Sequence, residues 1–300
     1  MTTPVTADRR MVLVHAHPDD ETIGTGVTMA RYAAEGAHVT LVTCTAGEEG
    51  EILVPELEHL GAAHTDALAE HRREELAAAM RELGVTDHRF LGGFGRWRDS
   101  GMAGTPSTER PDAFCNADLL EASTEVVAIL REIRPQVLVT YDQVGDYGHP
   151  DHIQAHRVAM YGAMLAAVGT YRPDLGQAWD VPKIYWTALP VSAMQRGIDA
   201  MLAAGETGFF GVTDASELPF VQPDEVVTTL IDARDHEERK LAAMRAYPTQ
   251  ITVDGPFFAL SNNVGREAHG VEYFRIVKGA AVRGPDPFGG DHETDLFAGL

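Results

Sequence analysis

The sequence is poor in cysteine and in basic residues. Its two cysteines, Cys44 and Cys115, are too few for a disulfide framework and indicate a reducing compartment. Lysine and arginine together number 24 against 45 aspartates and glutamates, so the net charge is −21. A chain this acidic repels polyanions, which argues against nucleic acids and anionic membranes as partners.

Long apolar runs are also missing. The apolar run at residues 11–14 is ended by His15 and His17, whereas the core of a signal peptide needs about 7–15 apolar residues. No stretch of the sequence approaches the ~18 uninterrupted apolar residues of a membrane span. We therefore expect a cytoplasmic protein that does not bind a membrane.

What the chain does contain is a regular alternation of strand and helix patterns. Short apolar or β-branched runs are separated by segments with apolar residues at helical spacing. The expected strands lie at residues 11–16, 38–44, 88–91 and 136–141, and the expected helices at 22–35, 66–83, 118–133 and 150–168. This order is typical of βαβ units, so we predict an α/β fold with a Rossmann-like, mostly parallel sheet flanked by helices.

Beyond about residue 170 the pattern is less regular. Strand patterns return at residues 183–189 and 271–277, and a charged helix pattern occupies 232–247. A length of 300 residues suits one large domain or two ordinary ones. We predict a catalytic domain over residues 1–170 and a smaller α+β domain over 171–300 that completes the substrate site. The tail at 284–299, rich in glycine, aspartate and proline, is expected to be mobile.

The loop after the first expected strand is acidic. Residues 17–21 read HPDDE, one imidazole and three carboxylates, where a dinucleotide-binding loop would have a glycine-rich turn. Ligands bind at the carboxyl ends of parallel strands, so this loop is placed to hold a cation. Taken singly, His17 could be a core histidine, and Asp19 and Asp20 could be helix N-caps.

A second loop, after the fourth expected strand, repeats the pattern. Residues 147–152 read YGHPDH and match the first loop as HPDH against HPDD. Two such loops at one sheet edge would supply the nitrogen and carboxylate ligands of a catalytic Zn²⁺ with one open position. Fe²⁺ or Co²⁺ could occupy the same ligands, and His156 is a competing ligand on the following helix.

Together the two loops resemble those of the LmbE/PIG-L family of zinc-dependent N-deacetylases. Three further stretches, TAGEEGE at 45–51, GRWRDSGMAGT at 95–105 and ALSNN at 259–263, resemble the deacetylases of actinobacterial mycothiol biosynthesis. The resemblance covers nearly the whole chain and is weakest over residues 170–250. It implies hydrolysis of the acetamide of an amino-sugar inositol, with one Zn²⁺ per chain.

The resemblance also implies a role for each matching residue. His17, Asp20 and His152 correspond to the metal ligands, Asp19 to the general base, His149 to the general acid and Tyr147 to the group that stabilises the oxyanion. Acid–base and oxyanion groups of this kind each contribute ~10²–10³-fold or more in rate.

The substrate contacts implied by the resemblance are Arg72, Asp99 and Glu51, which would bind sugar hydroxyls. From the residues alone, Arg72 could instead be a helix-surface residue paired with Glu70 or Glu75. The acidic stretch around Glu51 could be a solvated turn.

One position departs from the pattern of the family. Relatives often carry Gly-Gly before the second loop, where this chain has Gly145-Asp146. The extra carboxylate could hold His149, shift its pKa or face solvent.

Acetyl removal from N-acetylglucosaminyl-inositol is the leading hypothesis, and three other functions are alternatives to it. An amidase that cleaves mycothiol S-conjugates would share both metal loops, but the stretch at 95–105 favours the deacetylase. A non-catalytic metal- or sugar-binding protein would not depend on Asp19. A nucleotide-dependent transferase is disfavoured because the glycine-rich turn is missing.

Overall fold

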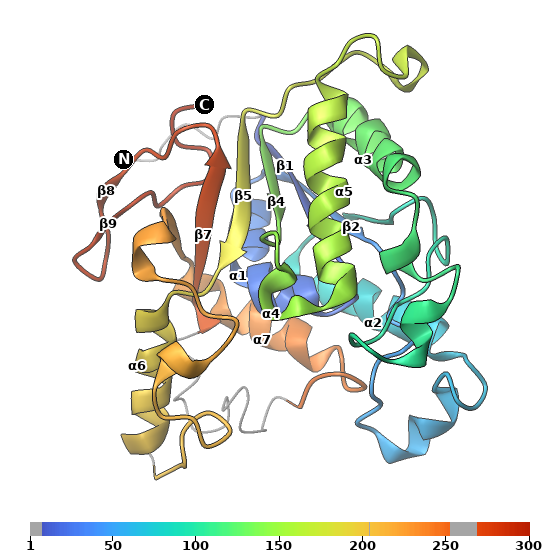
Figure 1. Cartoon of the computed structure of the whole chain (residues 1–300). Coiled ribbons are helices and arrows are strands. Elements are labelled where there is room, and N and C mark those ends of the chain that lie inside the picture. The colour runs from blue at the N-terminus through green and yellow to red at the C-terminus, as the bar shows by residue number, and fades with distance from the viewer. Residues whose placement is uncertain (1–7, 204, 253–268) are drawn as a thin grey trace.

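A seven-stranded sheet forms the centre of the computed structural model, which describes residues 8–203, 205–252 and 269–300 (Figure 1). The strands are β1 (Arg10–His15), β2 (His38–Thr43), β3 (Asp87–Phe90), β4 (Val137–Thr140), β5 (Lys183–Ala188), β6 (Thr229–Asp232) and β7 (Val271–Lys278). Their order is β3-β2-β1-β4-β5-β7-β6. Neighbours from β3 to β5 are parallel, whereas β7 is antiparallel to both β5 and β6. The predicted α/β fold with a mostly parallel sheet is confirmed.

Helices cover both faces of this sheet. They are α1 (Asp20–Ala34), α2 (Leu68–Leu83) and α7 (Glu237–Arg245) on one face, and α3 (Leu119–Ile133) and α5 (Pro150–Ala166) on the other, which is toward the viewer in Figure 1. Alternate residues of β1 enter different cores: Met11 and Leu13 pack with α1, α2 and α7, and Val12 and Val14 with α3 and α5. Burial on both sides explains why this strand reads as a continuous apolar run.

All eight elements expected in the first half are present, and each lies within two residues of its predicted bounds. Local signals account for this agreement. The Asp118 side chain caps α3 by accepting from the Glu121 backbone N–H, and α2 ends at Gly84, whose φ is 77°.

The region beyond residue 170 matches the predicted elements only in part. Strands β5 and β7 lie where strands were expected, but helix α7 is shorter than predicted because Asp232 belongs to β6. Helix α6 (Val191–Ala203) and strand β6 were not predicted. Strands β5, β6 and β7 extend the same sheet that the first half begins, and the domain division at residue 170 stays a prediction.

The tail at residues 284–299, whose mobility stays a prediction, has defined secondary structure and buried contacts. Residues 284–299 contain the short strands β8 (Gly284–Pro285) and β9 (Asp291–His292) and bury Glu293, Leu296 and Phe297. The Glu293 carboxylate accepts from Lys183 Nζ at 2.5 Å and from the Tyr185 hydroxyl at 2.6 Å. The composition of the tail gave no sign of these contacts, because they depend on residues of β5 that are distant in the sequence.

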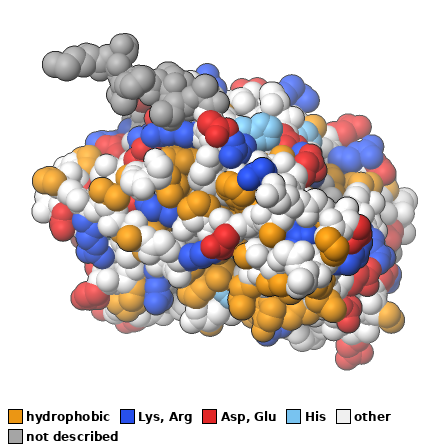
Figure 2. Space-filling model, turned by 90° about the horizontal axis from the view of Figure 1, so that it is seen from above, with side chains coloured by type: hydrophobic (Ala, Val, Ile, Leu, Met, Phe, Trp, Pro, Cys, Tyr) orange, Lys and Arg blue, Asp and Glu red, His pale blue; other side chains and the backbone are white. Residues whose placement is uncertain are grey.

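Charge is mixed on the surface of the molecule. On the face shown in Figure 2, basic side chains are dispersed among acidic ones, and hydrophobic side chains gather toward the lower edge of the view. Within the part of the chain that the structure describes, no helix combines the length and apolarity needed to cross a membrane.

Helices α3 and α5 pack closely at Gly162. A Cβ atom there would lie 2.6 Å from the Val126 side chain and 3.1 Å from the Ser123 carbonyl oxygen. We expect Gly162→Ala to lower the free energy of unfolding by about 1–3 kcal/mol, because the added methyl forces the helices apart. Gly197→Ala in α6 is the matched control, since a Cβ there meets open space and should not destabilise. Denaturant unfolding measures both, and equal stability of the two variants would contradict this account.

Candidate metal centre and active site

The sheet topology brings the two acidic loops together. Strand β1 lies between β2 and β4, so the direction of winding reverses at β1 and β4. The loop from β1 leads into α1, and the loop from β4 leads through α4 (Gly145–Gly148) into α5. Both loops leave the carboxyl edge of the sheet at this switch point, where α/β proteins bind their ligands.

His17 lies at the centre of a group of carboxylates. Its Nδ1 is 3.2 Å from Asp20 Oδ2, and its Nε2 is 3.2 Å from Asp151 Oδ2 and 3.4 Å from Asp99 Oδ1. Burial alone would lower the pKa of His17, but Asp99, Asp151 and Asp20 together raise that pKa well above its usual value. The excess of negative charge around one imidazole makes this a site for a cation.

His152 completes the predicted ligand set. Its Nε2 lies 3.3 Å from Asp20 Oδ1, and its ring stacks on Tyr141 with centroids 4.2 Å apart. Tyr141 also donates to Asp20 Oδ2 at 2.8 Å, so one phenol orients both predicted ligands. Both ring nitrogens of His152 are buried and make no hydrogen bond of good geometry within the described residues, where their one polar contact is that of Nε2 with Asp20. Buried imidazole nitrogens normally have a hydrogen-bond partner. Coordination to a metal ion would give one nitrogen of His152 a partner, so these residues fit a metal site.

More than one combination of side chains is close enough to share an ion. Ligand atoms lie within 4.8 Å of one another in two groups, His17 with His149 and His152, and His17 with Asp99 and Asp151. The cluster can therefore hold a metal ion, and His17 belongs to both groups.

The two aspartates of the first loop have different surroundings. Asp19 Oδ2 is 3.1 Å from an Arg72 Nη atom, and burial raises the pKa of Asp19 to about 8 against the opposing effect of Arg72. Burial acts on Asp20 in the same sense, but His152 and His17 hold its pKa well below the usual range. The Asp20 carboxylate is thus held in its ionised form among possible ligands, whereas burial makes the Asp19 carboxylate more basic than usual.

His149 begins helix α5 and is oriented by the backbone. Its Nδ1 accepts from the Asp151 backbone N–H at 3.1 Å, so a neutral ring carries its proton on Nε2. Burial, and then His17 and His152, lower the pKa of His149 to about 3. The Tyr147 ring lies 5.0 Å from the His152 ring and is half-exposed. His149 and Tyr147 therefore present N–H and O–H donors beside the cluster.

Arg72 is buried in the site, so its alternative as a helix-surface residue is wrong. Its side chain is 3% exposed, and it donates to the Gly47 carbonyl oxygen at 2.8 Å and to the Pro18 carbonyl oxygen. With the Asp19 ion pair, these contacts join α2 to the loops after β1 and β2.

The loop after β2 enters the site through Glu48 rather than Glu51. Glu48 is buried and accepts from the Asp99 backbone N–H at 2.9 Å, whereas the Glu51 side chain is exposed. Asp99 in turn accepts from the Gly101 and Glu49 backbone N–H groups at 2.8 and 3.2 Å. The role of Glu51 stays a prediction, and Glu48 is the member of this loop that sequence reasoning missed.

Two other residues were not assigned from the sequence. Asp151, inside the second motif, is fully buried and accepts from both the backbone and the hydroxyl of Ser100. Tyr141 ends the fourth expected strand and accepts from the Ala16 backbone N–H at 2.9 Å. The motif itself offered a signal for Asp151, but the position of Tyr141 follows only from the pairing of β4 with β1.

Asp146 and His156 lie beside the cluster. Asp146 is partly buried and accepts from Thr187 Oγ1 at 3.2 Å, and burial raises its pKa to about 7. It therefore does not simply face solvent. His156 Nδ1 contacts the Tyr141 carbonyl oxygen at 3.0 Å, and its ring lies against Trp186, so it has partners other than the cluster.

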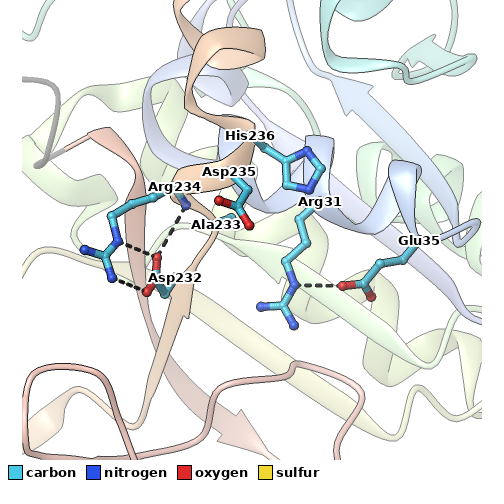
Figure 3. Close-up of a pocket in the computed structure, with 7 residues that line it drawn as sticks. All are labelled: Arg31, Glu35, Asp232, Ala233, Arg234, Asp235 and His236. Atoms are coloured by element: carbon cyan, nitrogen blue, oxygen red, sulfur yellow. Dashed lines mark hydrogen bonds and ion pairs between the residues drawn. The ribbon is translucent and has the colours of Figure 1, made fainter. Parts of the chain in front are cut away.

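Two cavities lie outside the cluster. One, of about 480 Å³, is lined by Arg31, Glu35, Asp232, Ala233, Arg234, Asp235 and His236. In it Arg31 pairs with Glu35, and Arg234 pairs with Asp232 (Figure 3). The other, of about 560 Å³, is lined in part by Glu49, Arg98, Gly101 and Met102, which adjoin Asp99 in space or in sequence. Only the second is next to the predicted substrate contacts.

A family model for PIG-L, described as GlcNAc-PI de-N-acetylase, matches residues 12–162, which include both metal loops. The chain belongs to the PIG-L family. It is 61% identical to a 1D-myo-inositol 2-acetamido-2-deoxy-alpha-D-glucopyranoside deacetylase from Geodermatophilus obscurus, covering 99% of each chain. A relative of the same name from Kribbella flavida is 59% identical and covers 98% of each chain. The predicted family resemblance is confirmed.

Solved structures of the same fold include proteins of different activity. The N,N'-diacetylchitobiose deacetylase of Pyrococcus horikoshii matches with a TM-score of 0.61 at 20% identity, covering 92% of this chain and 86% of that one. The 4-carboxy-2-hydroxymuconate hydratase of Pseudomonas putida matches with a TM-score of 0.62 at 19% identity, covering 91% and 97%. At this identity the likeness concerns the fold alone. The ALSNN stretch at 259–263 lies outside the described residues.

Proposed function

We propose that this PIG-L family enzyme hydrolyses the acetamide of 1D-myo-inositol 2-acetamido-2-deoxy-α-D-glucopyranoside, releasing the free amine and acetate in mycothiol biosynthesis. The observation that carries this substrate is the 61% identity over 99% of both chains with a deacetylase of that name. Two free cysteines and an acidic composition fit a cytoplasmic enzyme that acts on a small molecule.

The metal is proposed to be one Zn²⁺ per chain, held by His17, Asp20 and His152. Imidazole and carboxylate donors without thiolate suit catalytic zinc, and the unpartnered nitrogens of His152 support its role as a ligand. When bound, such an ion polarises an amide carbonyl and makes water acidic enough to serve as a nucleophile near pH 7.

Asp19 is proposed as the general base. Its contact with Arg72 orients the carboxylate and favours the ionised form, which a base must have before it accepts a proton. His149 would protonate the leaving amine through Nε2, since Nδ1 is bonded to the backbone of Asp151. Because burial holds its pKa low, His149 would be neutral before substrate binds. To act as an acid it would take up on Nδ1 the proton that Asp19 removes from water, and the contact from the Asp151 backbone N–H would break. The half-exposed Tyr147 hydroxyl would donate to the developing oxyanion.

The substrate is proposed to bind between Arg72, Asp99 and the loop at 95–105. Asp99 is buried beside His17, where it could accept from a sugar hydroxyl close to the reacting amide. The cavity of about 560 Å³ next to Asp99 offers room for a second ring. Several residues of the 95–105 stretch, which resembles the deacetylases rather than the mycothiol S-conjugate amidases, line this cavity.

A direct comparison of substrates tests this proposal. We expect zinc-loaded protein to release amine from N-acetylglucosaminyl-inositol at least about tenfold faster, in kcat/KM, than from a mycothiol S-conjugate. Amine release is measured on both compounds with an Asp19→Asn blank. Preference for the S-conjugate would replace the proposed substrate by the amidase alternative, and turnover of neither compound would overturn both.

A further inference from the structure

The backbone of Asp19 has an uncommon conformation. Its φ of 114° and ψ of −35° lie outside the regions that residues with a Cβ adopt readily. Such a conformation persists only where its surroundings fix it. Here the Asp19 carbonyl oxygen accepts from the Thr22 and Ile23 backbone N–H groups, and its own N–H donates to Glu21 Oε2 at 3.0 Å. Glu21 therefore holds the amide side of the strained residue.

Glu21 is in turn held by Tyr247, far away in the sequence. The Glu21 side chain is fully buried, and its Oε1 accepts from the Tyr247 hydroxyl at 2.7 Å and from Thr22 Oγ1 at 2.5 Å. The Tyr247 ring is also fully buried, directly after the end of α7. The Tyr247 hydroxyl thus fixes the Glu21 carboxylate, and Glu21 in turn fixes the backbone of Asp19.

The same segment is bonded to α2, the helix that carries Arg72, the ion-pair partner of Asp19. The Thr249 backbone N–H and Oγ1 donate to the two carboxylate oxygens of Glu75 at 3.1 and 2.7 Å. Glu75 is buried on α2 three residues after Arg72, so the two side chains share a face of the helix. Residues 247–250 therefore reach Asp19 by two routes, through its backbone and through the helix that carries its charged partner.

A buried ion pair fixes α7 against α1. Lys240 Nζ donates to the Ile23 carbonyl oxygen at 2.8 Å and to Glu272 Oε1 at 2.7 Å. Glu272 on β7 also accepts from the backbone N–H groups of Val27 and Thr28 at 3.1 and 2.9 Å. Because α7 is anchored to the middle of α1, the Tyr247 that follows it has a fixed position relative to the first turn of α1.

We infer that residues 247–250 form a positioning strap for the catalytic base, in which Tyr247 holds the Asp19 backbone through Glu21 and Thr249 holds, through Glu75, the helix that carries Arg72. This inference rests on the proposed role of Asp19. Tyr247 and Thr249 are positioning residues and take no part in binding the metal or transferring a proton. Small displacements of a catalytic group are costly, since a shift of about 1 Å can lower a rate 10²-fold.

The first test is Tyr247→Phe, which removes one hydroxyl and keeps the ring. We expect kcat to fall about 10–100-fold while KM changes less than about twofold and the metal content is unchanged. Tyr185→Phe is the matched control, because it also removes a fully buried phenol that donates to a buried carboxylate, Glu293. The two variants should lose similar thermal stability, but the control should keep its kcat.

Two further variants separate positioning from general stability. Thr249→Val should lower kcat/KM about tenfold by removing the Oγ1 contact with Glu75, and Thr249→Ser should restore it. In an Asp19→Asn background, Tyr247→Phe should cause no further loss, because its effect acts through Asp19. Additive losses in this double-mutant cycle would overturn the inference, as would an equal fall of kcat in Tyr185→Phe.

The outcome for the strap can be distinguished from the outcome for the proposed function. Turnover of the acetylated substrate by the wild-type protein tests the proposed function. The ratios of kcat among the variants test whether residues 247–250 position Asp19. If the wild type acts on no acetylated amino sugar, crystal structures of Tyr247→Phe and the wild type decide the strap. A changed Asp19 φ in the variant would support it, and the same φ in both would overturn it.

Discussion

Replacing Asp19 by asparagine is expected to lower kcat about 10³-fold while the purified protein keeps its metal. Asp19 forms an ion pair with Arg72, whereas Asp20 contacts both predicted histidine ligands, so the loss of Asp19 should remove a base and leave the ion in place. Asparagine is the informative substitution because it tolerates positive φ better than most residues and so preserves the backbone. Amine release and elemental analysis of the same preparation measure the two effects.

The matched control is Asp20→Asn in the same loop. Asp20 contacts both His17 and His152, so this variant should lose metal and activity together. Loss of metal from Asp19→Asn, with retention by Asp20→Asn, would show that the roles of the two aspartates are reversed.

Replacing His152 by alanine is expected to release the metal ion and reduce turnover below detection. Neither ring nitrogen of the buried His152 makes a hydrogen bond of good geometry to a described residue, so coordination to the metal ion would satisfy one of them. Metal content after dialysis is the primary measurement. The wild-type protein should lose activity on chelation and regain it with added Zn²⁺, whereas His152→Ala should not recover.

His156→Ala controls for the loss of a histidine from α5. It lies one turn later on that helix and contacts the Tyr141 carbonyl oxygen and Trp186. We expect it to keep both metal and activity. Full metal content in His152→Ala would instead favour the group formed by His17, Asp99 and Asp151.

The first half of the fold could be predicted because its signals are local. Apolar runs mark strands buried on both faces, and caps such as Asp118 and Gly84 mark helix ends. In the second half α6 and β6 were missed, although β6 has the same length as the correctly predicted β3 and β4. Its strands are defined mainly by pairing with β7, which depends on residues distant in the sequence.

The candidate site shows the same division between local and distant information. The two motifs and the order of strands were enough to predict that His17, Asp20 and His152 would meet. Spacing could not show whether Glu48 or Glu51 faces inward, since both belong to one acidic loop. It also could not show the burial of Arg72, whose partners come from the loops after β1 and β2.

The ion pair between Lys240 and Glu272 has a further consequence for how the molecule fluctuates. Glu272 covers two amide groups in the middle of α1, so the helix cannot open there without uncovering a buried carboxylate and its lysine. Separating a buried charge from its partners is strongly unfavourable. Helix α1 and strand β7 should therefore open as one cooperative unit, and partial unfolding that frees the helix must also detach the strand.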